Sequence, residues 1–354
     1  MVKYSESTTM KTLKPFLSFS SLNLRLCLGL CLSLLISCNT KESRIITVTG
    51  EIPASAIGKT LHHEHLLVDF IGADSSGYHR WDKNEVVEKV LPYLLEIKKL
   101  GYKTLVECTP AHLGRDPELM KMLSEKSGIQ IITNTGYYSA VGGKYIPEHG
   151  YKESAEQLAA RWIDEAKNGI EGTGIYPGFI KIAVEREPLE ELHRKVVEAA
   201  CITHKATGLV IMSHTGPALP AFQEIEILKQ NGVDPSAFIW THAQNEIEFS
   251  KHIEAAKMGA WIGFDNFNPG QLERYVEFAQ LMKKEGLLDK VLFSHDAGWY
   301  KPGEPNGGEF RGFTEIEEIL IPSLEKNGIS QHDIHQLFTA NPAEAFKVKI
   351  RLEE

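Results

Sequence analysis

The stretch Thr60-Leu61-His62-His63-Glu64-His65-Leu66 decides how the rest of the chain is interpreted. It is an apolar segment in which His63 and His65 stand two positions apart. In a strand, alternate residues share a face, so these two side chains would project to the same side. Two imidazoles on one face form half of a site for a first-row metal ion. The alternative is a pair of hydrogen-bonded strand histidines, and the remaining sequence has to decide between the two.

Length and composition limit the class of protein. The chain has 354 residues, enough for one large α/β barrel or two ordinary domains. Its formal net charge is -9 and it has no basic stripe, which argues against a nucleic-acid partner. Of five cysteines, only Cys108 and Cys201 fall in the folded part. They do not form a disulfide framework, and the sequence leaves open whether they pair.

Residues 1–38 have the form of an export signal. Lys11, Lys14 and Arg25 precede the apolar run 26–36, which is too short to span a bilayer comfortably. The run ends Leu35-Ile36-Ser37-Cys38, which resembles the lipobox of bacterial lipoproteins. That resemblance implies a lipid anchor on Cys38, a short tether over residues 39–44, and a periplasmic or surface location in a bacterial cell envelope. A plain signal peptide with an incidental cysteine is the alternative.

From Ile45 onward, short apolar runs alternate with longer amphipathic ones. The predicted strands are 60–70, 103–108, 130–135, 178–184, 208–213, 237–241, 260–264 and 290–294. The predicted helices are 84–100 with Asn84 as cap, 117–127, 153–169, 188–207, 219–231, 246–258, 271–285, 315–327 and 331–346. This α/β pattern predicts a single (β/α)8 TIM barrel over residues 45–354. A doubly wound sheet is the alternative, but the glycine fingerprint it needs after the first strand is missing from the sequence.

Side chains that bind metals stand where a barrel has its active face, at the C-terminal ends of the strands. The first strand carries His63 and His65, and the strand 178–184 holds one lysine among apolar residues. Three later strands end at residues of the same kind, namely His214, His242 and Asp296. Any one of them could be an ordinary hydrogen-bonded barrel residue. Their recurrence at successive strand ends predicts a metal site.

Several motifs carry a resemblance to a known family. They are Gly58-Lys59-Thr60-Leu61-His62-His63-Glu64-His65, Gly114-Arg115-Asp116, Thr135-Gly136-Tyr137-Tyr138, Gly172-Thr173, Phe179-Ile180-Lys181-Ile182-Ala183, Ser213-His214-Thr215 and Ser294-His295-Asp296. Together they are specific, and they extend over nearly the whole domain. The chain resembles the phosphotriesterase family of the amidohydrolase superfamily, which also contains lactonases.

The resemblance implies a binuclear metal centre at the C-terminal face of the barrel. His63, His65 and Asp296 would hold the more buried ion, and His214 and His242 the more exposed one. Lys181, carboxylated by CO2, would bridge the two. Zn is the expected metal for this histidine-rich set, with Mn, Co and Fe as alternatives.

A lysine can serve in such a site only after a chemical change. An ammonium cannot bind a cation, but a buried, deprotonated amine can react with CO2, and the carbamate then acts as a carboxylate. The alternative for Lys181 is a buried ion pair with Glu107 or Glu185.

Two divalent ions about 3.5–4 Å apart can share a hydroxide that attacks a carbonyl carbon or a phosphorus. The resemblance implies that Asp296 accepts the proton of this hydroxide. It also places Tyr138 near the hydroxide, although a tyrosine that only packs at the barrel rim is an equal alternative. One position departs from the family. Phosphotriesterases commonly have an aspartate three residues after the histidine of strand six, and this chain has Asn245, which cannot relay a proton.

The remaining residues receive supporting roles. The loop 297–313, with Trp299 and Tyr300, is expected to form much of the pocket for the leaving group. Arg115 and Asp116 are expected to pair at the rim, while Asp265, His62 and His295 are expected to support or pack around the site. The other histidines are expected at the surface: His79, His112, His149, His193, His204, His252, His332 and His335.

The sequence therefore predicts a lipid-anchored enzyme, a metal-dependent hydrolase acting on a lactone or carboxylic ester. The first alternative is an aryl phosphotriester hydrolase. A second, of a different class, is a non-catalytic metal-binding lipoprotein, and a third is a mononuclear deaminase-type relative, which would lack Lys181. Homodimers are common among relatives, but the sequence does not specify an interface.

The lipobox gives a direct prediction. Cells that express the wild-type protein with a radiolabelled fatty acid should yield labelled protein, and the Cys38→Ala variant should remain unlabelled, because the acyl chains are attached at that thiol. An unlabelled wild type, or label that survives the substitution, would exclude the anchor.

Overall fold

The computed structural model describes residues 43–353. The predicted signal peptide, Cys38 and residues 39–42 of the predicted tether lie outside this range. Arg44 already belongs to the first strand, β1 (Arg44–Thr47), which pairs with β2 (Gly50–Pro53) in an antiparallel hairpin. Among residues 43–353, no helix is both long enough and apolar enough to cross a bilayer.

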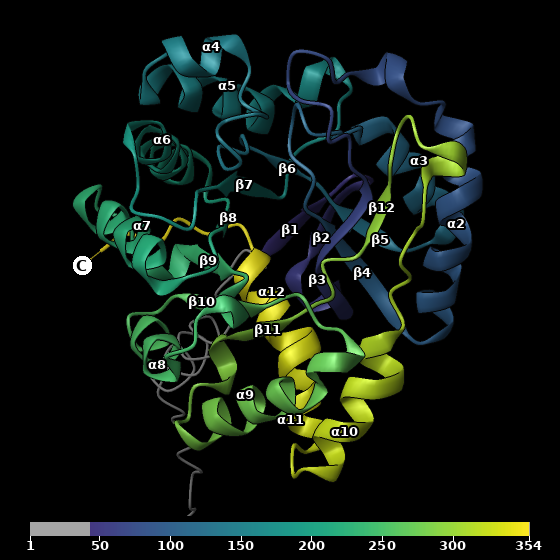
Figure 1. Ribbon diagram of the computed structural model, residues 1–354, viewed down its shortest axis with the longest axis vertical. Coiled ribbons are helices and arrows are strands. Elements are labelled where there is room, and N and C mark those ends of the chain that lie inside the picture. Colours follow the sequence, from purple (N-terminus) through teal and green to yellow (C-terminus); the bar gives the residue numbers. More distant parts are fainter. Residues whose placement is uncertain (1–42, 354) are drawn as a thin grey trace, which may run out of the picture. The chain divides into compact units, whose positions relative to one another are not determined.

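Parallel strands form the barrel predicted from the sequence (Figure 1). Every predicted strand is present within a few residues of its expected bounds. In chain order they are β3 (Lys59–Leu67), β4 (Tyr102–Glu107), β5 (Gln130–Ile132) continued as β6 (Asn134–Thr135), β7 (Phe179–Ala183), β8 (Ile211–His214), β9 (Phe238–Thr241), β10 (Trp261–Phe264) and β11 (Val291–Phe293) continued as β12 (Gly298–Tyr300).

Two interrupted strands close the ring. One sheet has the order β12-β3-β4-β5 and the other the order β11-β10-β9-β8-β7-β6. The two sheets meet where β5 runs into β6 through Thr133, and again where β11 runs into β12. At each seam one strand pairs first with one neighbour and then with the other. The chain therefore forms a (β/α)8 barrel, although its hydrogen-bond ladder is divided.

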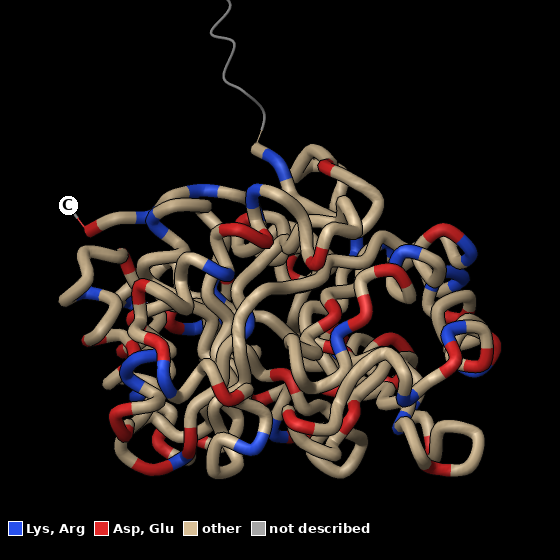
Figure 2. Tube along the Cα trace, turned by 90° about the horizontal axis from the view of Figure 1, so that it is seen from above, with Lys and Arg blue, Asp and Glu red and all other residues tan. Residues whose placement is uncertain are grey.

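Helices follow the strands and surround the barrel. They are α2 (Lys83–Lys99), α3 (Pro117–Ser127), α5 (Ala155–Asn168), α6 (Glu191–Thr207), α7 (Ala218–Gln230), α8 (Phe249–Lys257) and α9 (Leu272–Lys284), with α10 (Ile321–Lys326), α11 (Gln331–His335) and α12 (Asn341–Phe346) near the C-terminus. Much of the charge lies on these outer helices and on loops (Figure 2). The cap predicted at Asn84 is wrong by two residues. Asp82 caps α2, because it stands just before the helix and its carboxylate accepts from the backbone N–H groups of Asn84 and Glu85.

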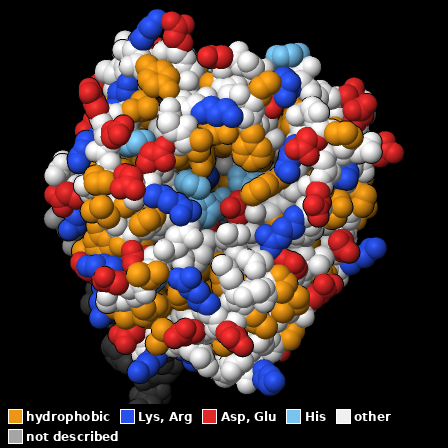
Figure 3. All heavy atoms as spheres, viewed as in Figure 1, with side chains coloured by type: hydrophobic (Ala, Val, Ile, Leu, Met, Phe, Trp, Pro, Cys, Tyr) orange, Lys and Arg blue, Asp and Glu red, His pale blue; other side chains and the backbone are white. Residues whose placement is uncertain are grey.

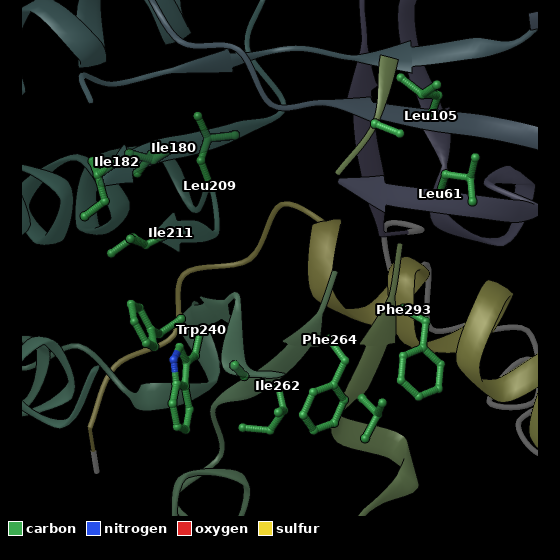
Figure 4. Packing of buried hydrophobic residues seen from close by; sticks show 14 of the residues in the cluster. Leu61, Leu105, Ile180, Ile182, Leu209, Ile211, Trp240, Ile262, Phe264 and Phe293 are labelled. Atoms are coloured by element: carbon green, nitrogen blue, oxygen red, sulfur yellow. The ribbon is translucent and has the colours of Figure 1, made fainter. Parts of the chain in front are cut away.

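Strand alternation divides the core into two clusters. Side chains such as Leu105, Ile211 and Phe293 pack between the barrel and the helices (Figure 4). Their strand neighbours, Val106, Met212 and Leu292, belong to a second cluster. Because adjacent side chains point to opposite faces, the second cluster fills the barrel interior. The β1–β2 hairpin adds Ile45 and Ile52 to it, so the hairpin contributes to the packing of the interior.

A buried glutamate joins the two sides of the seam between β3 and the end of the barrel. The Glu64 carboxylate accepts hydrogen bonds from Ser294 Oγ at 2.7 Å, His295 Nδ1 at 2.7 Å and the backbone N–H of Ala297 at 2.9 Å. Burial alone would raise the pKa of Glu64, but the His295 imidazole and these hydrogen bonds hold it below its ordinary value. The carboxylate therefore stays ionised and fixes residues 294–297 against β3.

Removing this carboxylate should weaken the fold. Glu64→Ala leaves several buried donors without an acceptor, which should lower the free energy of unfolding of the metal-free protein by about 3 kcal/mol or more. Urea unfolding measures this, with Glu125→Ala, an exposed position on α3, as control. Equal stability of the two variants would show that the seam does not depend on Glu64.

The same group should contribute to acid unfolding. The pKa of Glu64 is lowered in the folded protein, so its stabilisation is complete above the ordinary carboxyl pKa and is lost as pH falls toward the folded-state value. The unfolding free energy of wild type should therefore fall more steeply below about pH 4 than that of Glu64→Ala. Parallel curves for the two proteins would contradict the assignment.

Candidate metal centre

A pocket opens at the C-terminal end of the barrel, where Figure 3 shows a hollow with histidine side chains at its base. Its volume is about 160 Å³. All seven residues predicted for the site line it: His63, His65, Tyr138, Lys181, His214, His242 and Asp296. The structure therefore brings together, from separate strands, the residues that the sequence placed at strand ends.

The polar atoms of these side chains converge. Asp296 Oδ1 lies 3.2 Å from His65 Nε2 and 3.7 Å from His63 Nε2, and Asp296 Oδ2 lies 4.0 Å from His242 Nε2. His242 Nε2 in turn lies 2.7 Å from His214 Nδ1. Four imidazoles and one carboxylate thus direct ligand atoms toward one small volume. His63, His65 and Asp296 also satisfy the geometry expected of a metal-binding cluster.

Asp265, at the end of β10, sets the tautomers of two of these rings. Its two carboxylate oxygens lie 2.8 Å from His63 Nδ1 and 2.8 Å from His242 Nδ1. Burial alone would raise the pKa of Asp265, but His242 and His63 hold it well below its ordinary value. An ionised carboxylate only accepts hydrogen bonds, so each Nδ1 carries the proton and each Nε2 turns a lone pair toward the pocket.

His65 is held in the same way through a hydroxyl. Its Nδ1 lies 2.8 Å from Thr109 Oγ1, which donates to Glu107 Oε1 at 2.7 Å. Because that hydroxyl proton is already engaged, Thr109 accepts from His65 Nδ1, and the Nε2 of His65 is left with its lone pair free. Burial raises the pKa of Glu107 to about 7. The sequence did not predict that Thr109 and Glu107 support the site. The sequence at the end of a strand does not show which residue of a neighbouring strand a histidine nitrogen will contact.

Lys181 is the side chain whose surroundings most need a further group. It is 1% exposed, and its Nζ has no hydrogen-bond partner within the described part of the chain. Both predicted ion-pair partners are engaged elsewhere: Glu107 by Thr109 and Glu185 by the backbone N–H of Gly142. Burial lowers the pKa of Lys181, which favours the neutral amine. A buried, unpartnered amine beside converging imidazole lone pairs fits a carbamate that bridges two cations.

The backbone around the site is built for close approach. A Cβ at Gly136 would lie 2.2 Å from the carbonyl oxygen of Lys181, and a Cβ at Gly298 would lie 1.8 Å from that of His65. Only glycine fits at either place. His242 and Asp296 both have positive φ, 59° and 53°, a region that few residues other than glycine adopt. Such strain is typical of functional residues that the surrounding structure holds in place.

Aromatic and apolar side chains form the pocket wall. Tyr138 lies against His214, with ring centroids 5.1 Å apart, and burial raises the pKa of its hydroxyl, so that it keeps its proton. Trp299 lies 6.3 Å from His65, ring centre to ring centre. The other lining residues are Val68, Phe70, Cys108, Pro110, Leu113, Val141 and Tyr145. Cys108 and Cys201, whose pairing the sequence left open, are both buried and unpaired.

Two predictions about supporting residues need correction. Only Trp299 of the loop 297–313 lines the pocket, while other parts of the loop lie beside α2, where Phe310 contacts Tyr93. Arg115 and Asp116 form no ion pair with each other in residues 43–353. Arg115 instead binds Glu165, while Asp116 caps α3 and accepts from Trp81 Nε1. Adjacent residues point apart at a strand–helix junction, which explains the error.

The histidines outside the site divide into two groups. His79, His332 and His335 are exposed and His112 and His149 half-buried, but the surface location predicted for His193, His204 and His252 is wrong. These three lie on the inner faces of α6 and α8, and His204 and His252 bond to backbone carbonyls. As expected, Asp265 supports two ligands, His295 binds Glu64, and His62 is buried outside the pocket. Asn245 is exposed on the turn after β9.

Comparison with known proteins agrees with this geometry. An aryldialkylphosphatase from Saccharolobus solfataricus is 29% identical over 308 residues, covering 83% of this chain and 96% of the relative. An N-acetyltaurine hydrolase from Danio rerio is 25% identical over 344 residues, covering 85% and 97%. The structure of a mutant organophosphorus hydrolase from Deinococcus radiodurans superposes with a TM-score of 0.77 at 26% identity, covering 86% of this chain and 98% of that one.

A sequence model of the phosphotriesterase family matches residues 43–346, which is most of the chain and nearly all of the barrel. The converging histidines and Asp296 agree with a metal-dependent member of such a family. The protein therefore belongs to the phosphotriesterase family and is a metal-dependent hydrolase.

Proposed function

We propose that the protein is a binuclear metal-dependent hydrolase that cleaves lactones or other carboxylic esters. The observation that carries the proposal is the buried Lys181 amine, which has no partner in residues 43–353 and lies in one pocket with four histidines and Asp296. In this proposal His63, His65 and Asp296 hold one ion, His214 and His242 hold the other, and carboxylated Lys181 holds both. Zn is the proposed metal. Bound there, the ions would generate a nucleophile from water at neutral pH and polarise the substrate oxygen.

The side chains of this chain then have separate tasks. Burial alone would raise the pKa of Asp296, but His63 and its neighbours hold it far below its ordinary value. Asp296 is therefore ionised and can accept the proton of the attacking water. The protonated Tyr138 hydroxyl can donate a hydrogen bond to an oxygen of the substrate. The ring of Trp299 and the other apolar walls exclude water and position the acyl group.

The size and shape of the pocket favour an acyl substrate. A volume of about 160 Å³ compares with the roughly 10–15 Å³ that holds one water molecule on the same measure. A phosphotriester carries three substituents around phosphorus, whereas an ester carries two around its carbonyl carbon, so the ester is the better fit. The exposed side chains of Phe70 and Val141 extend the apolar wall to the rim.

Phosphotriester hydrolysis is the second candidate, because two of the compared proteins are named an aryldialkylphosphatase and an organophosphorus hydrolase. Asn245 speaks against it, since an asparagine cannot take up a proton. A third relative is named an N-acetyltaurine hydrolase, so an amide belongs in the same test. We further propose that the protein is anchored at Cys38 in the cell envelope, which would make external or envelope compounds its substrates.

The substrate class is tested by kcat/KM of residues 39–354 produced with zinc and bicarbonate. A lactone series, an aryl phosphotriester and N-acetyltaurine are compared side by side, and we expect lactones to lead by orders of magnitude. A leading phosphotriester or amide would overturn the ester assignment while leaving the metal site intact. A protein that binds two ions but hydrolyses none of these would favour the non-catalytic alternative, and one that binds no metal would overturn the whole proposal.

The bridging role of Lys181 gives a second prediction. Lys181→Ala should lose metal and lower kcat/KM at least a hundredfold, because both ions lose a shared ligand. A short carboxylic acid such as propionate should restore part of the activity by replacing the carbamate. Lys167→Ala, at an exposed position on α5, is the control. Full metal content and full rate in Lys181→Ala would exclude the bridge.

A further inference from the structure

His214 is held differently from the other three histidines of the centre. His63, His65 and His242 turn Nε2 toward the pocket, and in each of them Nδ1 is fixed by Asp265 or Thr109. His214 turns Nδ1 toward the pocket, 2.7 Å from His242 Nε2. Within residues 43–353 no side chain or backbone group bonds to its Nε2. Its ring therefore lacks the outer support that orients the other three.

The buried carboxyl group of Glu224 accepts hydrogen bonds from the two residues that flank His214. Ser213 Oγ donates to Glu224 Oε1 at 2.5 Å, and Thr215 Oγ1 donates to Glu224 Oε2 at 2.6 Å. Glu224 is on α7 and is 0% exposed. One oxygen of Glu224 thus holds the residue before His214, and the other oxygen holds the residue after it. A clamp of this kind fixes the backbone of residues 213–215 against a helix.

We propose that Glu224 is a positioning residue for His214, and that it aims Nδ1 of His214 at the more exposed metal ion of the centre. This inference rests on the proposed metal centre. An imidazole that binds through Nδ1 lies close to its own main chain, so its direction follows the backbone more closely than that of a ring binding through Nε2. Control of the flanking backbone can therefore replace a direct hydrogen bond to the ring.

A purely structural role explains Glu224 less well. A buried carboxyl group is costly, and an apolar residue of similar size on the inner face of α7 would serve packing at least as well. Both oxygens of Glu224 instead accept from the hydroxyls of the two residues beside His214, so the group makes contacts that an apolar side chain could not. Groups retained at such a cost are expected where the geometry of a site requires them.

The test measures metal affinity, not activity alone. The metal-free full domain is titrated with Zn²⁺ against a chelator, and the bound metal is counted after gel filtration. In Glu224→Gln one of the two ions should bind about 10–100-fold more weakly while the other is unchanged. Thr215→Val, which removes one arm of the clamp, should weaken the same ion to a lesser degree. Glu226→Gln, two positions along the same helix and exposed, is the matched control.

A double-mutant cycle identifies the ion. His214→Ala should weaken the same ion, and adding Glu224→Gln to it should cause no further loss, because the clamp acts only through that ring. Additive losses, equal weakening of both ions, or unchanged affinity in both Glu224→Gln and Thr215→Val would overturn the inference. If Glu224→Gln does not fold, the result for Thr215→Val decides. A wild type that binds no metal would instead overturn the proposed function, so the two failures can be told apart.

Discussion

The seam between β3 and residues 294–297 is the constraint on which the site depends, and the Glu64 carboxylate holds it together. The barrel closes there without a continuous ladder: the backbone N–H of Asp296 donates to His63, that of His65 donates to Ala297, and Glu64 accepts from the residues on both sides of Asp296. The contacts that close the barrel are therefore the same contacts that place Asp296 beside His63 and His65. A (β/α)8 barrel closed by a regular strand pair would need no buried carboxylate at this place.

The same arrangement recurs around the pocket. Asp265 supports His63 and His242, Glu107 supports His65 through Thr109, and Glu224 holds the residues beside His214. These carboxyl groups come from β10, β4 and α7, so different parts of the barrel each fix a different ligand. Buried carboxyl groups contribute little net stability, because desolvation offsets their hydrogen bonds. Several such carboxyl groups surround this one pocket. We infer that they fix the positions of the pocket histidines and do not add net stability to the fold.

Single residues show which parts of the fold and of the site could be predicted from the sequence. The strand–helix repeat and the meeting of the strand-end side chains in one pocket were predictable, because they rest on local periodicity and on the rule that places barrel sites at C-terminal strand ends. The contact of Thr109 with His65 and those of Glu224 with Ser213 and Thr215 were not, since they join residues that no local pattern relates. Arg115 failed as a prediction for the same reason: sequence adjacency suggested Asp116, whereas the fold supplies Glu165. His204 and His252 look like surface residues until the helix faces are known.

The two halves of the centre differ in how they are built. The half with His63, His65 and Asp296 rests on β3 and on the interrupted strand β11–β12, so its geometry follows from closure of the barrel. The half with His214 and His242 rests on neighbouring strands, β8 and β9, and depends on Asp265 and Glu224 for its orientation. In the proposed centre Lys181, on β7, would belong to both halves, and its Nζ has no hydrogen-bond partner in the described chain. A fold that already fixes every other ligand leaves the amine free to take up CO2, and this favours a shared bridge over two independent metal sites.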